Sequence, residues 1–174
     1  NSAVLIDRQG ACSSPYRKIA LVPCSERMPL QKILPFLNSI DFGQSDFSAG
    51  TGPVNFRWGG EEIGTLICFE SVFPPLARNP VRQGATLLVN ITNDFWFGRS
   101  AGPIQHAEMS ILRAIENRVP VVRCANSGVT CFIDRAGRVA LVAENDPTCF
   151  TPAIKTSDVG VPPASMPLTF YTRF

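Results

Sequence analysis

One uninterrupted apolar run constrains the fold of this 174-residue chain more than any other feature. Residues 85–91 read Ala-Thr-Leu-Leu-Val-Asn-Ile, which is typical of a strand covered on both of its faces. Similar strands are expected over 62–68 and 120–125, with helical patterns over 72–83 and 104–117. Because strands alternate with helices, the chain is predicted to form a layered α/β or α+β sandwich.

Hairpins and loops are expected around this alternating core. Gly59-Gly60 is a turn signal between the expected strands 53–58 and 62–68, and Arg135-Ala136-Gly137 is a second one between 129–134 and 138–143. The other expectations are a hairpin of strands 2–7 and 16–22, a helix over 29–37, loops over 39–52 and 93–103, and a late strand after 148 followed by an extended arm. On the helix over 104–117, one apolar stripe is expected to contain Ile104, Ala107, Ile111, Ala114 and Ile115.

Composition and charge exclude several classes of protein. With 45% hydrophobic and 17% charged residues, the chain has the composition of one globular domain with a buried core. A net charge of +2, without a run of basic residues, argues against nucleic-acid binding. No segment approaches the roughly 20 apolar residues of a membrane helix, and the N-terminus is too short for a signal peptide. Because a strand begins at once and without Met, we expect a piece of a longer protein.

The six cysteines give no sign of a metal site. None forms a Cys-x-x-Cys pair and the chain has a single histidine, so neither zinc nor another cofactor is predicted. Cys68 differs from the other five because an apolar, strand-forming run leads into it and a helix start follows. A thiol at the end of a buried strand, aimed at a helix N-terminus, can ionise and act as a nucleophile. The alternative from these residues alone is a structural cysteine in the core.

Three segments of the chain, one of which contains Cys68, resemble the same protein family. They read Tyr-Arg-Lys-Ile-Ala-Leu-Val-Pro-Cys-Ser-Glu at 16–26, Thr-Leu-Ile-Cys-Phe-Glu-Ser-Val-Phe-Pro at 65–74, and Asn-Ile-Thr-Asn-Asp-Phe-Trp-Phe-Gly-Arg-Ser-Ala-Gly-Pro-Ile-Gln-His at 90–106. Together they resemble the nitrilase superfamily of carbon–nitrogen hydrolases and, more narrowly, its apolipoprotein N-acyltransferase branch. The third segment is the most specific, because soluble nitrilases do not usually carry it.

The resemblance runs along essentially the whole chain and implies a fold. Residues 1–174 are expected to be the C-terminal portion of a single nitrilase-like domain, which is an αββα sandwich. The N-terminal part of that domain and the membrane helices of the family are expected to be absent from the chain.

The resemblance also implies a Glu–Lys–Cys triad. Cys68 matches the nucleophile and Lys18 the lysine, whereas the first catalytic glutamate of the family lies upstream of the point where this chain begins. Glu26 matches a second glutamate that supports the lysine, and Glu70 matches one beside the nucleophile. A thiolate would attack an ester or amide carbonyl to form a thioester, while Lys18 and the backbone N–H after Cys68 would stabilise the oxyanion. Taken singly, Lys18 could be a surface lysine, Glu26 a surface residue or a helix cap, and Glu70 a cap of the following helix.

Aromatic residues are the candidates for substrate binding. Phe69 follows the nucleophile and replaces a tyrosine of the family, and Trp96 and Phe97 lie in a glycine-flanked loop. This loop suits a lipid-facing lid, with plain core packing as the alternative. His106, at the end of the third segment, is expected to be structural.

One departure from the family pattern precedes Glu26. Cys24-Ser25 stands where the family has Phe-Gly. Glycine tolerates backbone conformations that other residues avoid, so its loss is expected to alter this turn.

By resemblance, the whole protein would transfer a fatty acyl chain from a phospholipid, through a Cys68 thioester, to the N-terminal amine of a diacylglyceryl-cysteine lipoprotein. The implied partners are the phospholipid donor, the lipoprotein acceptor and the membrane. The implied location is the bacterial inner membrane, with this domain on the periplasmic side. Two alternatives stay open: a soluble amidase or nitrilase that hydrolyses a small amide, and a non-catalytic fragment that only binds or scaffolds.

Overall fold

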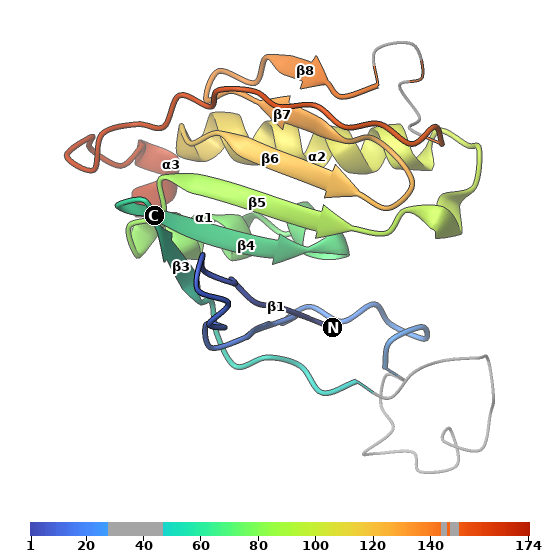
Figure 1. Ribbon diagram of the computed structural model, residues 1–174, viewed down its shortest axis with the longest axis horizontal. Helices are drawn as coiled ribbons and strands as arrows, with labels where there is room; N and C mark the ends of the chain where they lie inside the picture. Colours follow the sequence, from blue (N-terminus) through green and yellow to red (C-terminus); the bar gives the residue numbers. More distant parts are fainter. Residues whose placement is uncertain (28–46, 144–145, 147–149) are drawn as a thin grey trace.

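A computed structural model of the chain describes residues 1–27, 47–143, 146 and 150–174 (Figure 1). The helix expected over 29–37 and most of the loop expected over 39–52 lie outside these residues.

A six-stranded sheet forms the centre of the fold, and its strand order is the order of the chain (Figure 1). The central pairs β4–β5 and β5–β6 are parallel, and the outer pairs are antiparallel. Parallel neighbours need a crossover, which the helices α1 and α2 provide. The elements are β3 (Asn55–Trp58), β4 (Glu61–Ile67), α1 (Pro74–Arg82), β5 (Leu87–Thr92), α2 (Gly102–Asn117), β6 (Val121–Ala125), β7 (Cys131–Ile133) and β8 (Val139–Leu141). The predicted alternation of strands and helices, and both predicted central hairpins, are confirmed.

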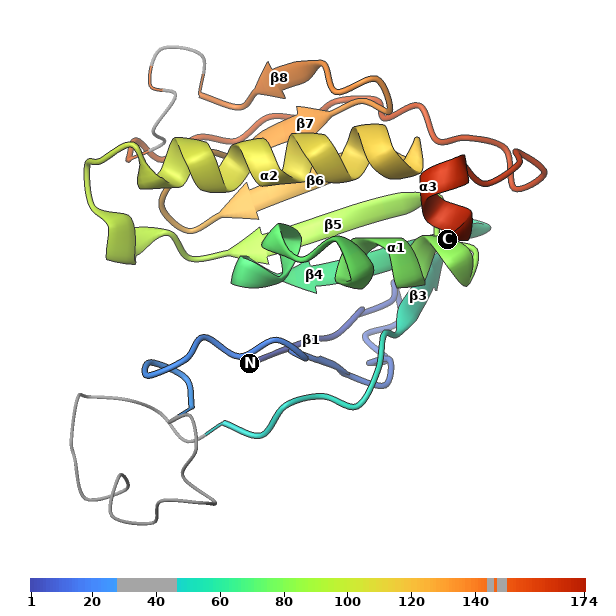
Figure 2. The same ribbon diagram turned by 180° about the vertical axis from the view of Figure 1, so that it is seen from behind.

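The helices α1 and α2 cover one face of the sheet (Figure 2). The main core lies between these layers and includes Leu66, Leu88 and Val121, each with at most 1% of its surface exposed. Gly64 on β4 lets α1 approach, because a Cβ atom there would lie 2.6 Å from the Cβ of Pro80.

The other face of β5 is only partly covered by the described residues. Along the strand, Leu88, Asn90 and Thr92 are buried, whereas 38% of Ile91 is exposed. Neither α1 nor α2 lies over this second face (Figure 1). The expectation that residues 85–91 are covered on both faces was therefore wrong for the structure described.

A short hairpin packs beside the edge of the sheet. It pairs β1 (Ser2–Ala3) with β2 (Tyr16–Arg17), so the predicted first hairpin is confirmed, although both strands are much shorter than expected. Ala3 and Tyr16 bury themselves against Phe56 and Ile67, which makes a second, smaller core.

Helix α2 buries a more polar face than predicted. Ala107 and Ala114 are buried as expected, but 40% of Ile104 and 48% of Ile115 are exposed. Polar residues take the buried positions on this helix: His106, Ser110, Arg113 and Asn117. Their polar partners come mainly from segments outside the sheet: His106 contacts Asp94, Arg113 donates to the Val72 carbonyl, and Asn117 accepts from Thr172. The apolar pattern alone did not reveal these partners.

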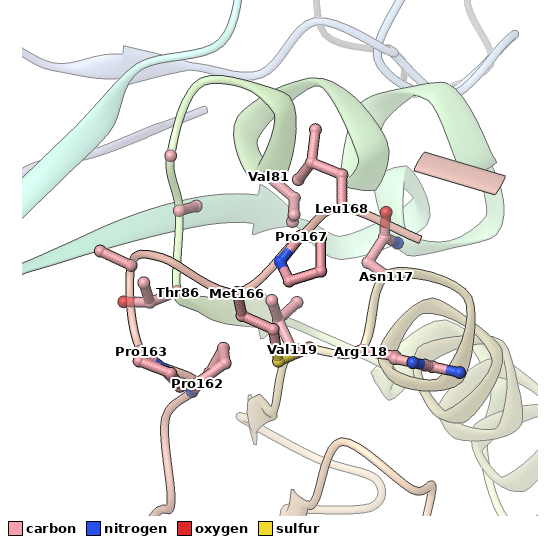
Figure 3. Close-up of a pocket in the computed structure, with 13 residues that line it drawn as sticks. Val81, Thr86, Asn117, Arg118, Val119, Pro162, Pro163, Met166, Pro167 and Leu168 are labelled. Carbon is pink, nitrogen blue, oxygen red and sulfur yellow. The ribbon is translucent and has the colours of Figure 1, made fainter. Parts of the chain in front are cut away.

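Residues 150–169 form a C-terminal arm that runs back across the molecule and leads into α3 (Phe170–Arg173). The late strand expected after 148 was wrong, because residues 150–174 contain no strand. The arm lines an open pocket of about 70 Å³ against the ends of α1 and α2, where Met166 and Leu168 face Val81 and Val119 (Figure 3). Among the described helices, none has the length and apolar character needed to cross a membrane.

Candidate active site

Cys68 lies in a strained turn between a strand and a helix. It follows β4 directly and begins the 3₁₀ helix η2 (Cys68–Val72). Its φ of 53° is in the left-handed region, which non-glycine residues seldom adopt. The residue is half-buried and is a free cysteine. Strain of this kind persists where surrounding contacts fix it and is concentrated at functional sites, which fits the predicted nucleophile.

Polar side chains surround the Cys68 carbonyl group. The Ser71 hydroxyl donates to this oxygen over 3.2 Å and the Asn90 amide over 3.4 Å, while His106 Nε2 lies 3.2 Å away. These side chains come from η2, β5 and α2, so three separate elements hold the peptide that follows the strained residue.

Arg123 lies behind these groups and is fully buried. Its guanidinium donates to Asp94 Oδ2 over 2.6 Å, to the Asn90 side-chain oxygen and to the Val129 carbonyl. Asp94 Oδ1 in turn accepts from His106 Nδ1 over 2.8 Å. Burial disfavours the Asp94 carboxylate, but the hydrogen bond from His106 and the charge of Arg123 outweigh it and lower the pKa of Asp94.

Glu70 connects the segment that carries Cys68 to the segment that carries Lys18. Its carboxylate is fully buried and accepts from the Tyr16 hydroxyl over 2.7 Å and the Ile67 N–H over 2.7 Å. It also accepts from the N–H groups of Ile19 and Ala20, over 2.6 and 3.1 Å. Burial, and then the nearby Glu70 carboxylate, raise the pKa of Tyr16 well above its ordinary value. Glu70 therefore does more than cap a helix, because it fixes the backbone immediately after Lys18.

Lys18 and Glu26 form a close ion pair. Lys18 Nζ lies 2.8 and 2.7 Å from the two carboxylate oxygens of Glu26, and 1% of Lys18 is exposed. The surface-lysine alternative is therefore excluded. Burial opposes ionisation of Glu26, but the hydrogen bonds from Lys18 and the Val22 N–H outweigh it and lower the pKa of Glu26.

The turn before Glu26 keeps a tight form without its glycine. Cys24 itself takes the left-handed backbone conformation, with a φ of 63°. The N–H of Glu26 donates to the Val22 carbonyl over 2.9 Å, which closes the turn. The glycine of the family pattern corresponds to Ser25, whose φ is not positive, so the left-handed conformation falls on Cys24, which stands where the family has Phe.

The structure brings the predicted Lys18, Glu26, Cys68 and Glu70 into one region. Ile19, next to Lys18, packs on the same small core as Cys68, and Glu70 bonds to both segments. Their catalytic roles remain predictions.

The aromatic candidates lie on or near the surface. The short helix η3 (Phe95–Phe97) leaves 79% of Trp96 and 44% of Phe97 exposed, so the core-packing alternative is excluded. The Phe97 ring lies 5.9 Å from the His106 ring. Phe69 is half-buried and meets Phe73 edge to face, with 5.0 Å between ring centres.

A hollow of about 730 Å³ lies at the end of β6, and Asn126, Phe150 and Ile154 are among the residues lining it. The Arg99 guanidinium lies 4.9 Å from the centre of the Phe150 ring. This cation–π contact connects the loop after η3 to the start of the C-terminal arm.

Sequence reasoning gave no role to Tyr16, Asn90, Asp94 or Arg123. One signal was available, because Asn90 and Arg123 interrupt runs of apolar residues in expected strands. Polar residues in such runs require buried partners.

Comparisons with known proteins agree with this geometry. The family model described as carbon-nitrogen hydrolase matches residues 1–161. Over 139 residues, the chain is 50% identical to the apolipoprotein N-acyltransferase of Geobacter metallireducens, which covers 80% of this chain and 27% of that protein. It is 36% identical to that of Chlorobaculum tepidum over 99% of this chain and 32% of that protein. The chain therefore spans about a third or less of the length of these relatives.

A solved structure supports the fold. A mutant of the amidase from Nesterenkonia sp. AN1, with acrylamide added at its active-site cysteine, aligns with a TM-score of 0.58 and 22% identity. The alignment covers 79% of this chain and 50% of that one, so the chain forms part of a nitrilase-like domain, as predicted. The chain belongs to the carbon–nitrogen hydrolase family, whose enzymes carry out acyl or amide transfer.

Proposed function

We propose that these residues are the nucleophile-bearing portion of an N-acyltransferase that modifies lipoproteins. The enzyme takes a fatty acyl chain from a phospholipid and transfers it to the N-terminal amine of a diacylglyceryl-cysteine lipoprotein. One observation carries the proposal: Cys68 in its left-handed turn is joined through Glu70 to the segment with the buried Lys18–Glu26 pair. The names of the similar proteins support this reaction over others of the family.

The reaction has two steps, which fit a thioester intermediate. In the first, the Cys68 thiolate attacks the ester carbonyl of the phospholipid; a C–S bond forms, the ester C–O bond breaks, and the lysophospholipid leaves with a proton. In the second, the amine of the lipoprotein attacks the thioester; an amide forms, the thiolate is released, and the amine gives up a proton. In both steps Lys18 and the Phe69 N–H stabilise the oxyanion.

The proton needs a carrier beside the nucleophile, and such a general base or acid contributes about 10²–10⁴-fold. The family resemblance assigns this task to a glutamate upstream of Asn1. Glu26 is not that group in the proposal, because both of its oxygens already bond to Lys18. Glu70 is not either, because its two oxygens accept four hydrogen bonds.

The exposed aromatic residues suit a lipid substrate. Phe95 and Trp96 are 70% and 79% exposed, which is unusual for large apolar side chains unless they meet a partner. We assign Trp96 and Phe97 to contact with lipid and Phe69 to the acyl chain beside the thioester. The proposal places the enzyme in the bacterial inner membrane, with this domain on the periplasmic side.

The test is intact mass spectrometry after incubation with phosphatidylethanolamine in detergent. The samples are this chain, a version extended upstream by the segment that its relatives carry, and Cys68→Ala of each. We expect the extended version to gain an acyl mass that hydroxylamine removes and that Cys68→Ala does not gain. No adduct on either version would refute the transferase. Identical behaviour of Cys68→Ala in every assay would indicate a non-catalytic protein.

A small-amide hydrolase is the second candidate, because the fold is shared with an amidase. Hydrolysis of short amides without detergent or lipid, together with no transfer from phospholipid, would favour it.

A further inference from the structure

We propose that His106 and Asn90, held by Arg123 and Asp94, are positioning residues that aim the Phe69 N–H at the oxyanion formed when Cys68 attacks a carbonyl group. This inference rests on the proposed function, since it assumes that Cys68 is acylated. It assigns a task to the only histidine of the chain, which was expected to be merely structural.

Two branches start from the Arg123 guanidinium and meet at one backbone oxygen. In the first, Arg123 fixes the side-chain oxygen of Asn90, so the Asn90 amide nitrogen faces the carbonyl groups of Leu66 and Cys68, at 3.3 and 3.4 Å. In the second, Arg123 holds Asp94, Asp94 holds His106, and His106 Nε2 reaches the same Cys68 oxygen at 3.2 Å.

In the second branch, the direction of the last hydrogen bond follows from the Cys68 carbonyl group that receives it. His106 Nδ1 lies 2.8 Å from Asp94 Oδ1 and 3.1 Å from the Arg123 guanidinium, and Nε2 lies 3.2 Å from both the Cys68 oxygen and the Ser71 hydroxyl. A carbonyl oxygen only accepts hydrogen bonds, so His106 supports Cys68 through the Nε2–H group. Thr92 donates to the same Asp94 oxygen over 2.9 Å and limits the rotation of the carboxylate. Asp94, His106 and Arg123 are at least 94% buried, so water competes little for these bonds.

Fixing the Cys68 carbonyl also fixes the next N–H. The C=O of Cys68 and the N–H of Phe69 belong to one planar peptide unit and point in opposite directions. Phe69 lies in the first turn of η2, where a helix offers its N–H no internal acceptor. Donors on the carbonyl also polarise the peptide and strengthen its N–H as a donor. The network therefore acts on the oxyanion through the peptide and touches neither substrate nor thiol.

Two substitutions of His106 separate its two nitrogens. His106→Gln can place an amide nitrogen near the Nε2 position and donate to Cys68, whereas His106→Asn reaches only the Nδ1 position and bonds only to Asp94. Glu108→Gln, on the exposed side of the same helix, is the control. All are made in the version extended upstream.

Two reactions of Cys68 are compared. Acylation by p-nitrophenyl butyrate builds an oxyanion, and alkylation by iodoacetamide does not. We expect His106→Asn to slow acylation by about 10²-fold, the order of losing one oxyanion donor. We expect it to leave alkylation nearly unchanged, and His106→Gln to recover most of the acylation rate. Asn90→Ala should show the same selective loss as His106→Asn, and it replaces that variant if His106→Asn does not fold.

Equal effects of His106→Asn and His106→Gln, or equal slowing of acylation and alkylation, would overturn the inference in favour of a structural role. If the unmodified enzyme reacts with p-nitrophenyl butyrate but not with phosphatidylethanolamine, the proposed function fails while this inference is still tested. If neither ester acylates Cys68, both fail.

Discussion

The two sides of the candidate site are built very differently. Cys68 directly follows β4, the second strand of the six-stranded sheet, and a buried network encloses its backbone. Lys18 follows a two-residue strand, and its partner Glu26 lies beyond an irregular turn. Sheet and helices thus position the nucleophile, whereas a few side-chain hydrogen bonds position the lysine. Among the described contacts, the Glu70 carboxylate is the main polar connection between the two sides.

The largest expected effect comes from the centre of the cysteine side. Arg123→Met leaves Asp94 as a buried carboxylate without its cation and frees Asn90, so we expect a loss of about 3–5 kcal/mol in the free energy of unfolding. Chemical denaturation measures it. Arg57→Met is the matched control, because the exposed Arg57–Glu62 pair should contribute less than about 1 kcal/mol. Similar losses for both variants would contradict the importance of the network.

Removing the connection should separate the two sides. Glu70→Gln replaces one acceptor oxygen with a donor that faces backbone N–H groups, and should cost about 2–3 kcal/mol. Hydrogen exchange should accelerate at residues 16–22, while the amides of β5 and β6 keep their protection. Glu108→Gln on the exposed face of α2 is the control. Uniform acceleration across the sheet would show that the two sides are not separate.

The Lys18–Glu26 pair should make the lysine side sensitive to acid. Because the folded-state pKa of Glu26 lies below its ordinary 4.5, its stabilising contribution is complete above that value and is lost as the pH falls through the lowered pKa. Glu26→Gln should therefore lower stability by about 1–3 kcal/mol at neutral pH, with a difference that narrows below pH 4.5. Unfolding measured from pH 7 to 3 provides the curve. If the stability difference between Glu26→Gln and the unmodified chain does not change with pH, the stabilising role of the ionised Glu26 carboxylate is contradicted.

The smallest effect concerns the strained turn of the lysine side. Cys24→Gly introduces a residue that accepts the left-handed conformation, and should raise stability by about 0.5–1 kcal/mol. The same substitution at Cys124, in strand β6, should lower stability instead, since glycine weakens a strand. Thermal unfolding of both variants decides it, and a loss at both positions would mean that Cys24 is not strained.

The sequence predicted the cysteine side better than the lysine side. Apolar runs and glycine turns predicted β3 to β8 because these strands depend on local patterns. The strands 2–7 and 16–22 were predicted too long, since Tyr16 and Ile19 owe their positions to the distant Glu70. Local periodicity also could not show that Ile104 and Ile115 would lie outside while His106 and Arg113 lie inside. Their positions depend on polar partners that the fold brings together.

The strand order of the sheet has a consequence for how the chain folds. From β3 to β8, each strand pairs with the one synthesised just before it, so the sheet can grow at one edge without long chain closures. The lysine segment is made earlier, yet its hydrogen bond from Ile19 spans 51 residues to Glu70. Closing that long loop lowers the conformational entropy of the chain before the Ile19–Glu70 contact can stabilise it. The turn of Cys68 is therefore expected to form before the Lys18 segment docks beside it. The Cys68 thiol would then gain the positive charge of Lys18 only late in folding.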